Sequence, residues 1–384
     1  MAAPRLNAET RGIVAKLKTY ADRTLPNAKT MPREVYTSQA FQELEKSRIF
    51  EREWLCAGRA ESIPKAGDYL TYKIGDQPVL IIRQKDGSIA AFSNVCRHRM
   101  MRLLEGKGSC RRIVCPYHAW TYEIDGRLVA AKHMERTNRF DVGKVELPKV
   151  RCEVWNGWIY VTLNKRSASV ARKLARLDDV IRDYHAEDYV EVDRQEHVWN
   201  TNWKLLSENF MEGYHLPVTH RKTVGAYFPV EDTRFAAGKA DDNFTFQWFT
   251  KTEDAPVGTA HAKNKTLKGD MRRTSVLGSV YPCHMFVLAP DHLWYLSLHP
   301  LDTERIHIVY GLAFAPELMA EKGKLKARIA EAKAYLDATN EEDRFVVEGL
   351  CEGVKAPLAE PGPLSWLEKE NLDFTRYILR CMTR

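Results

Sequence analysis

The chain has 384 residues, 44% of them hydrophobic, and a formal net charge of +7. This length allows more than one domain with a core of its own. Eight cysteines are too few for a disulfide scaffold, so a reducing, cytoplasmic setting is expected. No apolar run approaches the roughly 20 residues that span a membrane. Because basic and acidic residues are interleaved, a nucleic-acid binder is not expected either.

The first half of the chain changes character near residue 50. Residues 1–50 are predicted to form helices that pack on the larger domain after residue 165, because apolar residues recur three or four positions apart in 8–24 and in 38–50. Residues 51–165 contain short β-rich runs separated by turn signals such as Asp125-Gly126. This pattern predicts a small antiparallel β domain.

Residues 166–384 combine both patterns and are predicted to form a second, larger domain. Helical periodicity covers 201–215 and also 317–354, where two helices are expected. Strand-like runs occupy 244–251, 284–290, 292–300 and 305–316. The mixture predicts an α+β fold in which helices cover an antiparallel sheet.

Two Cys/His pairs stand in the β domain, Cys96-x-His98 and Cys115-x-x-His118, with sixteen residues between them. A structural zinc site is one interpretation, but zinc fingers usually keep the two cysteines together and the two histidines together. Mixed pairs instead suit a [2Fe–2S] cluster in which two thiolates hold one iron and two imidazoles hold the other. Replacing thiolates by neutral imidazoles raises the reduction potential of such a cluster.

The text around these pairs, "NVCRHRM" and "CPYHAWTYEIDGRL", resembles the cluster loops of Rieske non-haem iron oxygenase α subunits. The resemblance implies a Rieske [2Fe–2S] domain at residues 51–165 and a mononuclear iron domain at 166–384. One position departs from the family pattern, because Met100 stands where the family often has glycine.

A second histidine pair, His215 and His220, lies in "ENFMEGYHLPVTH". Positions five apart on a helix do not face one metal, but Pro217 is expected to break the helix, so that the two imidazoles converge. Glu212, three residues before His215, can accept the second N–H of that imidazole. Two histidines and one carboxylate form the facial triad that leaves positions on Fe(II) open for O2, whereas a hydrolytic zinc site is the alternative.

The segment "NTNWKLLSENFMEGYHLPVTH" is similar to the catalytic helix of the same family. The similarity implies that His215 and His220 bind the mononuclear iron. The C-terminal "NEEDRFVVEGLCEGV" resembles the helix that carries the last ligand, which implies Asp343, with Glu342 as the alternative.

Assembly is also implied by the resemblance. Family members form head-to-tail trimers in which electrons cross from the cluster of one subunit to the iron of the next. Glu212 occupies the position of the acid that links His215 to the neighbour's cluster histidine, here His118. No nucleotide-binding fingerprint is visible, so a separate NAD(P)H-dependent flavin or ferredoxin reductase is expected.

The substrate is the least determined feature. Candidate pocket residues are Phe249, Tyr281, Phe286, Trp294 and Tyr295, whose rings could contact a quaternary ammonium group or stack on an aromatic ring. A glutamate at position 212 resembles the carnitine, betaine and choline monooxygenase branch. The expected activity is therefore monooxygenation or N-demethylation of a quaternary ammonium compound. An aromatic-ring hydroxylase is the alternative, and a Rieske electron carrier is a further one.

Overall fold

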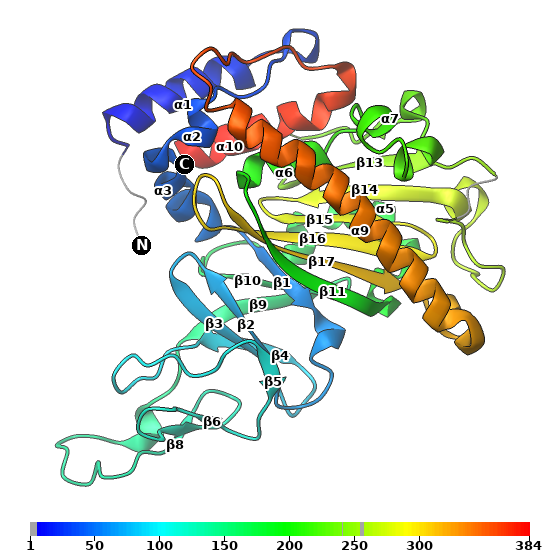
Figure 1. Cartoon of the computed structure of the whole chain (residues 1–384). Coiled ribbons are helices and arrows are strands. Elements are labelled where there is room, and N and C mark those ends of the chain that lie inside the picture. Colours follow the sequence, from blue (N-terminus) through cyan, green and yellow to red (C-terminus); the bar gives the residue numbers. More distant parts are fainter. Residues whose placement is uncertain (1–5, 240, 254–256) are drawn as a thin grey trace. The chain divides into compact units, whose positions relative to one another are not determined.

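The computed structural model describes residues 6–239, 241–253 and 257–384 (Figure 1). The chain divides into two compact units. One unit contains the residues up to Ile49 together with Ala171–Arg384, and the other is Phe50–Val170. The expected α+β fold, with a small β domain and a larger helix-covered sheet, is confirmed.

The smaller unit is built on an antiparallel sheet with the strand order β1-β10-β9-β4-β3-β2-β5. A second, short sheet has the order β6-β7-β8. The strands are β1 (Leu55–Arg59), β2 (Asp68–Ile74), β3 (Gln77–Arg83), β4 (Ile89–Ser93), β5 (Lys107–Ser109), β6 (Ile113–Val114), β7 (Thr121–Tyr122), β8 (Leu128–Ala130), β9 (Lys149–Trp155) and β10 (Trp158–Thr162). The β-rich runs of the sequence correspond to β2, β3, β4, β6, β7 and β10, whereas β1, β5, β8 and β9 were not predicted.

A compact core lies between these two sheets, and Cys96 and Cys115 are part of it. Phe92, Trp120 and Tyr122 pack in the same cluster and are almost completely buried. The two cysteines are therefore anchored in a closely packed core.

The larger unit contains a second antiparallel sheet, with the order β11-β17-β16-β15-β14-β13-β12. Its strands are β11 (Val190–Trp199), β12 (Arg234–Phe235), β13 (Phe244–Thr250), β14 (Thr274–Val280), β15 (His284–Leu288), β16 (His292–Pro300) and β17 (Ile306–Phe314). Each of β13 to β17 pairs with its neighbour in sequence, which gives a meander. Strand β11, which precedes these strands in the chain, pairs with β17 at one edge of the sheet.

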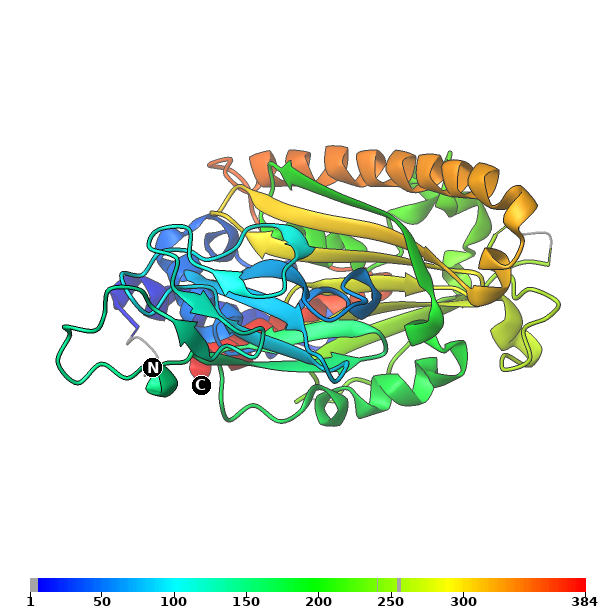
Figure 2. The ribbon, with the colours of Figure 1, turned by 90° about the horizontal axis from the view of Figure 1, so that it is seen from below.

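The helices of the described chain are α1 (Ala8–Ala21), α2 (Glu34–Thr37), α3 (Gln39–Glu45), α4 (Val170–Lys173), α5 (Ala175–Ile181), α6 (Trp203–Phe210), α7 (Leu216–Thr219), α8 (Pro316–Met319), α9 (Lys322–Gly353) and α10 (Lys369–Thr383). Figure 2 shows that α9 runs along one face of the larger sheet. The two helices expected in 317–354 are α8 and α9, which differ greatly in length. A single turn, α8, precedes one continuous helix, because the polar segment 337–344 does not interrupt α9.

Helix α6 is fixed at its beginning by a side-chain cap and by a buried ion pair. The Asn202 side chain accepts a hydrogen bond from the backbone N–H of Lys204, which satisfies one of the free donors of the first turn. The Lys204 ammonium lies 2.8 Å from Glu45 on α3, and both side chains are 1% exposed. Trp203 donates its indole N–H to the same carboxylate at 2.9 Å. These contacts tie α6 to the N-terminal helices.

Among the described residues, none of the helices combines the length and the apolar character that crossing a membrane requires.

Candidate functional site

The two loops that carry the Cys/His pairs have the same backbone design. In the first loop, the N–H of Cys96 donates to the carbonyl of Met101 and the N–H of Met100 donates to the carbonyl of Cys96. In the second, Cys115 and Ala119 make the equivalent bonds, with Trp120 in place of Met101. The residue four positions after each cysteine is left-handed, with φ of 57° at Met100 and 56° at Ala119. Glycine adopts this conformation without strain, which accounts for its frequent use at the position of Met100.

These loops bury the thiols and expose the imidazoles. Cys96 and Cys115 are 2% and 3% exposed, whereas His98 and His118 are exposed. The two imidazole rings lie 4.8 Å apart between centroids. Trp120 stacks on His98 at 4.9 Å, so the ring of His98 is held in one orientation.

The thiols are also arranged for a shared ligand. Both cysteines are free, and the Cys115 thiol is close enough to contribute to a raised pKa of Cys96. Burial raises the pKa of Cys96, while the Tyr122 hydroxyl, 3.3 Å from its sulfur, partly offsets this effect. Two buried thiols beside two exposed imidazoles fit a [2Fe–2S] cluster with one iron on each pair, whereas a single ion needs four converging ligands.

The second histidine pair flanks the short helix α7. Helix α6 ends at Phe210, so Glu212 and His215 lie in the turn that follows it and not on a common helical face. His215 is the residue before α7, His220 is the residue after it, and Pro217 lies in its first turn. Proline is favoured there, because its missing N–H would have no helical partner. Pro217 therefore starts a helix and does not break one, yet the two imidazoles converge as predicted, with ring centroids 5.0 Å apart.

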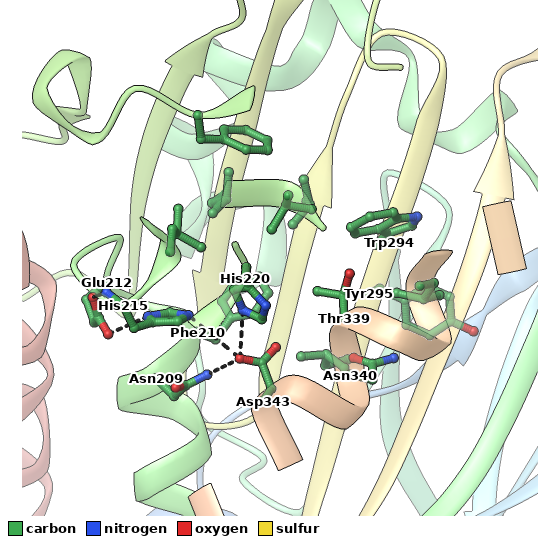
Figure 3. A pocket seen from close by; sticks show the side chains of 17 residues that line it. Asn209, Phe210, Glu212, His215, His220, Trp294, Tyr295, Thr339, Asn340 and Asp343 are labelled. Atoms are coloured by element: carbon green, nitrogen blue, oxygen red, sulfur yellow. Dashed lines mark hydrogen bonds and ion pairs between the residues drawn. The ribbon is translucent and has the colours of Figure 1, made fainter. Parts of the chain in front are cut away.

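Both imidazoles face Asp343 on α9 (Figure 3). The Asp343 Oδ1 atom lies 3.0 Å from Nε2 of His220 and 3.7 Å from Nε2 of His215. One potential ligand atom from each of the three residues lies within 4.8 Å of the other two. Asn209 on α6 donates its amide to the same Oδ1 at 2.7 Å, which orients the carboxylate.

The other ring nitrogen of each histidine contacts a glutamate. Nδ1 of His215 lies 2.5 Å from Glu212 Oε1, and Nδ1 of His220 lies 2.8 Å from Glu342 Oε2. Thr223 donates its hydroxyl to the same Glu342 oxygen at 2.6 Å. Burial alone would lower the pKa of His220, but its bonds to Asp343 and Glu342 outweigh burial and raise it.

This donor set fits one divalent metal ion. Two Nε2 atoms and one carboxylate converge on a common point, and each Nδ1 is held by a carboxylate that fixes the tautomer and orientation of its ring. Asp343 lies at the point of convergence, whereas Glu342, the alternative, lies behind His220 on the Nδ1 side. The acidic surroundings favour a bound cation.

A pocket opens beside the three residues. Its walls come from the α6–α7 region, the sheet and α9. The lining residues are Asn209, Phe210, Glu212, His215, Leu216, His220, Val224, Phe228, Leu277, Val287, Trp294, Tyr295, Leu296, Leu336, Thr339, Asn340 and Asp343. A largely apolar pocket with a few polar groups beside it is the usual form of a site for a small organic molecule.

The predicted aromatic residues are divided between this pocket and the core. Trp294 and Tyr295 line the pocket, whereas Phe249, Tyr281 and Phe286 are not among its lining residues. Phe249 is completely buried behind the lining, and Tyr281 packs on the rings of α10. Phe286 lies over Gly278 on the neighbouring strand. Sequence alone does not distinguish a core ring from a pocket ring on a strand that is buried on both faces.

Several lining residues were not predicted, notably Phe210, Phe228, Thr339 and Asn340. Asn340 and Thr339 lie three and four residues before Asp343 on α9. This spacing places them on the helix face that carries Asp343, and it is the signal that could have identified them.

Comparison with known proteins agrees with both centres. Residues 53–148 match the family model described as "Rieske [2Fe-2S] domain". Residues 150–384 match the model described as "Ring hydroxylating alpha subunit (catalytic domain)". The second match alone covers more than half of the chain.

Individual relatives span almost the whole chain. The glycine betaine monooxygenase oxygenase subunit of Pseudomonas aeruginosa (strain UCBPP-PA14) is 29% identical over 366 residues, which cover 88% of this chain and 85% of that protein. A quaternary ammonium Rieske monooxygenase, solved for insight into carnitine oxidation and inter-subunit electron transfer, is 24% identical. The structural match covers 99% of this chain and 100% of that protein's chain, with a TM-score of 0.78.

The naphthalene 1,2-dioxygenase of Rhodococcus sp. has the same fold, with a TM-score of 0.81, 20% identity and coverage of 98% of both chains. Together, the two family models span nearly all of residues 53–384. The chain therefore belongs to the ring-hydroxylating oxygenase α subunits, oxidoreductases that carry a Rieske [2Fe–2S] cluster and a mononuclear iron.

Proposed function

We propose that this chain is the terminal oxygenase of a system that monooxygenates an N-methyl group of a quaternary ammonium compound. The observation that carries the proposal is the composition of the pocket. Aromatic residues line it, among them Phe210, Phe228 and Trp294, and none of the described lining residues is a lysine or an arginine. Aromatic faces beside carboxylates attract a quaternary ammonium ion. The names of the relatives, which act on glycine betaine and carnitine, support the same substrate class.

We assign Cys96, His98, Cys115 and His118 to the cluster. His215, His220 and Asp343 are assigned to the iron. Bound there, the two groups would supply single electrons and a place for O2 to be reduced. The residues of the chain provide orientation: Asn209 holds the Asp343 carboxylate, and Glu212 holds the proton on Nδ1 of His215. The apolar walls of the pocket exclude water from the reacting methyl group.

In this reaction one oxygen atom enters a C–H bond of the methyl group, while two electrons and two protons convert the other oxygen atom to water. The resulting hydroxymethyl ammonium releases formaldehyde and a proton and leaves a tertiary amine. Oxygen uptake and formaldehyde release should therefore be equal when electron supply is fully coupled to turnover.

Electron supply is proposed to involve a separate reductase and further copies of this chain, all in the cytoplasm. A separate NAD(P)H-dependent reductase would reduce the cluster, and a head-to-tail homotrimer would place His118 of one subunit beside Glu212 of the next. Exposed apolar residues support such an interface. Met100 is 82% and Tyr117 51% exposed near the cluster loops, and Val218 is 82% exposed near Glu212.

The proposed activity is tested with the iron-loaded protein, a generic reductase and a panel of quaternary ammonium compounds and aromatic hydrocarbons. Formaldehyde from an ammonium substrate supports the proposal, whereas a diol or a phenol from an aromatic substrate indicates the ring-hydroxylase alternative. Iron content separates both from a pure electron carrier, because an oxygenase binds three irons per chain and a carrier binds two.

The proposed electron path is tested by mixing two inactive variants, Cys96→Ser and His215→Ala, and re-forming the oligomers. Mixed trimers contain pairs of an intact cluster and an intact iron site on adjacent subunits. Recovered activity supports transfer between subunits, and no recovery at any mixing ratio contradicts it. Each variant re-formed by itself is the control.

A further inference from the structure

The positive charge of the chain is concentrated in one part of the smaller unit. Residues 97–149 contain twelve lysines and arginines but only six aspartates and glutamates, so they account for +6 of the net charge of +7. All twelve basic residues are exposed. The segment includes both loops that carry the Cys/His pairs and the long loop between β8 and β9 (Figure 1). A surface charge of one sign at this density attracts a partner of the opposite sign.

Local ion pairs neutralise only part of this charge. Four of the twelve basic side chains pair with acids of the same segment. None of the other eight forms an ion pair with a residue that the structure describes: Arg97, Arg99, Lys107, Arg111, Lys132, Arg136, Arg139 and Lys149. Because exposed charges contribute little to stability, folding alone does not account for this excess.

The loop between β8 and β9, residues 131–148, is called the basic loop below. Its basic residues Lys132, Arg136 and Arg139 are exposed. Four of its apolar residues pack instead against the core that contains both cysteines of the Cys/His pairs: Met134, Phe140, Val142 and Val145. The basic loop therefore joins a positively charged surface to the interior that surrounds the cluster site.

A row of rings leads from the basic loop to the cluster site. The ring centroids of Phe140 and Trp120 are 5.4 Å apart. Trp120 stacks on His98 at 4.9 Å, with the two ring planes 7° apart. Phe140 is half-buried, whereas Trp120 is 5% exposed. Close packing leaves few voids along this line, and electron tunnelling weakens less through packed atoms than through gaps.

The two imidazoles of the cluster site have different neighbours. His98 is stacked on Trp120, whereas His118 lies against Tyr117 with ring centroids 3.7 Å apart. The planes of the two imidazoles differ by 67°. Because His118 is the residue proposed to meet Glu212 of the next subunit, the side of His98 is the one that suits a different partner.

We infer that the basic loop is the docking surface of an electron-transfer protein with an acidic surface, and that electrons enter through Phe140, Trp120 and His98. The inference rests on the proposed function, which requires a separate reductase, and it adds where that partner binds. In each encounter one electron leaves the partner's redox centre and is received at the cluster, and no atom is transferred. Entry at His98 and exit at His118 then use the two imidazoles separately.

The test follows reduction of the oxidised holoenzyme by its colour in a stopped-flow instrument, so it does not depend on turnover. The probe is a reduced plant-type [2Fe–2S] ferredoxin of strongly acidic composition, whose potential of about −400 mV lies below that of a Rieske cluster. Its second-order rate constant is expected to fall about tenfold as salt rises from about 0.01 to about 1 M, because screening removes the attraction. Reduced methyl viologen, a small cation, is the control and should show no such fall.

Charge variants locate the docking surface. The double variant Arg136→Glu/Arg139→Glu is expected to lower the rate constant for ferredoxin about tenfold at low salt, without slowing reduction by methyl viologen. The matched control is Arg234→Glu/Lys326→Glu, which makes the same change of charge at exposed positions of the larger unit and should have little effect. All four positions are exposed, so the variants are expected to fold.

Phe140→Leu tests the path through the rings, because it keeps an apolar side chain and removes the ring. The limiting rate of reduction at saturating ferredoxin is expected to fall severalfold. The ferredoxin concentration that gives half of this rate, and the reduction potential of the holoenzyme, should stay unchanged. An unchanged limiting rate contradicts entry through Phe140.

Two other results overturn the docking surface. One is a rate constant for ferredoxin that does not depend on salt, or that falls equally in the two double variants. The other is loss of the oligomer in Arg136→Glu/Arg139→Glu with reduction by ferredoxin at the normal rate, which would place the basic loop against a neighbouring subunit. The proposed function is checked separately, since chemically reduced protein should release formaldehyde from an ammonium substrate in a single turnover whichever surface the donor uses.

Discussion

Nδ1 of His220 lies 2.8 Å from Oε2 of Glu342, so the residue beside Asp343 on α9 holds the ring that Asp343 faces from the other side. Adjacent acids on one helix thus contact both nitrogens of a single imidazole. Thr223 donates to the same Glu342 oxygen and limits the rotation of the carboxylate. The pair explains why two neighbouring carboxylates occur at this point of the chain.

Replacement of Glu342 by leucine is expected to lower iron affinity about 10- to 100-fold, because the His220 ring loses the partner that fixes its tautomer and orientation. Glu342→Gln should restore part of this affinity, since its amide oxygen can still accept the hydrogen bond. Iron content after dialysis against graded chelator measures the effect. The control is Glu341→Leu, whose side chain is 70% exposed. An unchanged affinity in Glu342→Leu would contradict the role.

Glu212→Gln is expected to retain both metal centres and lose most of the turnover, because a neutral amide at this position no longer attracts the neighbour's histidine. Metal analysis and the rate at which a pre-reduced cluster is reoxidised with substrate and O2 separate the two effects. Glu231→Gln, an exposed position, serves as the matched control. Full activity in Glu212→Gln would show that this carboxylate is not a link between subunits.

Glu45→Gln is expected to reduce the free energy of unfolding by about 3–5 kcal/mol, because it leaves the Lys204 ammonium buried without its counter-charge. Asp22→Asn breaks the exposed ion pair between Lys18 and Asp22, whose side chains are 63% and 60% exposed. This change should reduce the free energy of unfolding by less than about 1 kcal/mol. Denaturant unfolding of the two variants gives the comparison. Equal losses of unfolding free energy in the two variants would mean that the buried ion pair contributes no more to stability than the exposed one.

Glu370 makes stability depend on pH. Burial raises its pKa to about 8 from an ordinary value of 4.5, so the folded chain holds a proton here that the unfolded chain releases. The stabilisation is complete below pH 4.5 and is lost as the pH rises through about 8. Glu370→Gln, which stays neutral, should show a smaller fall in melting temperature between pH 6 and 9. A parallel fall in both proteins would refute this assignment.

Sequence analysis could predict the two histidine motifs because spacing alone limits their chemistry. A mixed Cys/His pair on a β loop has few uses, and a proline between His215 and His220 indicates a change in the helical path that lets the two imidazoles converge. The role of Pro217 was misjudged for the same reason, since proline at the beginning of a helix and proline that ends one look alike without the coordinates.

The pocket could not be predicted to the same depth. Strands β13 to β16 are buried on both faces, so apolar periodicity does not tell which face of Phe249 or Phe286 meets a cavity. On α9 the difficulty is reversed, because Thr339 and Asn340 look like surface residues until the helix is placed against the sheet. A polar residue inside a long helix is informative only after its neighbours are known.

The short helix α7 acts as a spacer of fixed length between His215 and His220. Its four residues fix the relative positions of the His215 and His220 backbones. The side chain of Val218, in the middle of α7, is 82% exposed and contributes little to the core. The positions of the two imidazoles should therefore withstand substitution of Val218, whatever its role at a subunit interface, but no insertion or deletion, since one added residue rotates the second histidine by about 100°. Change in this part of the chain is constrained in length far more than in composition.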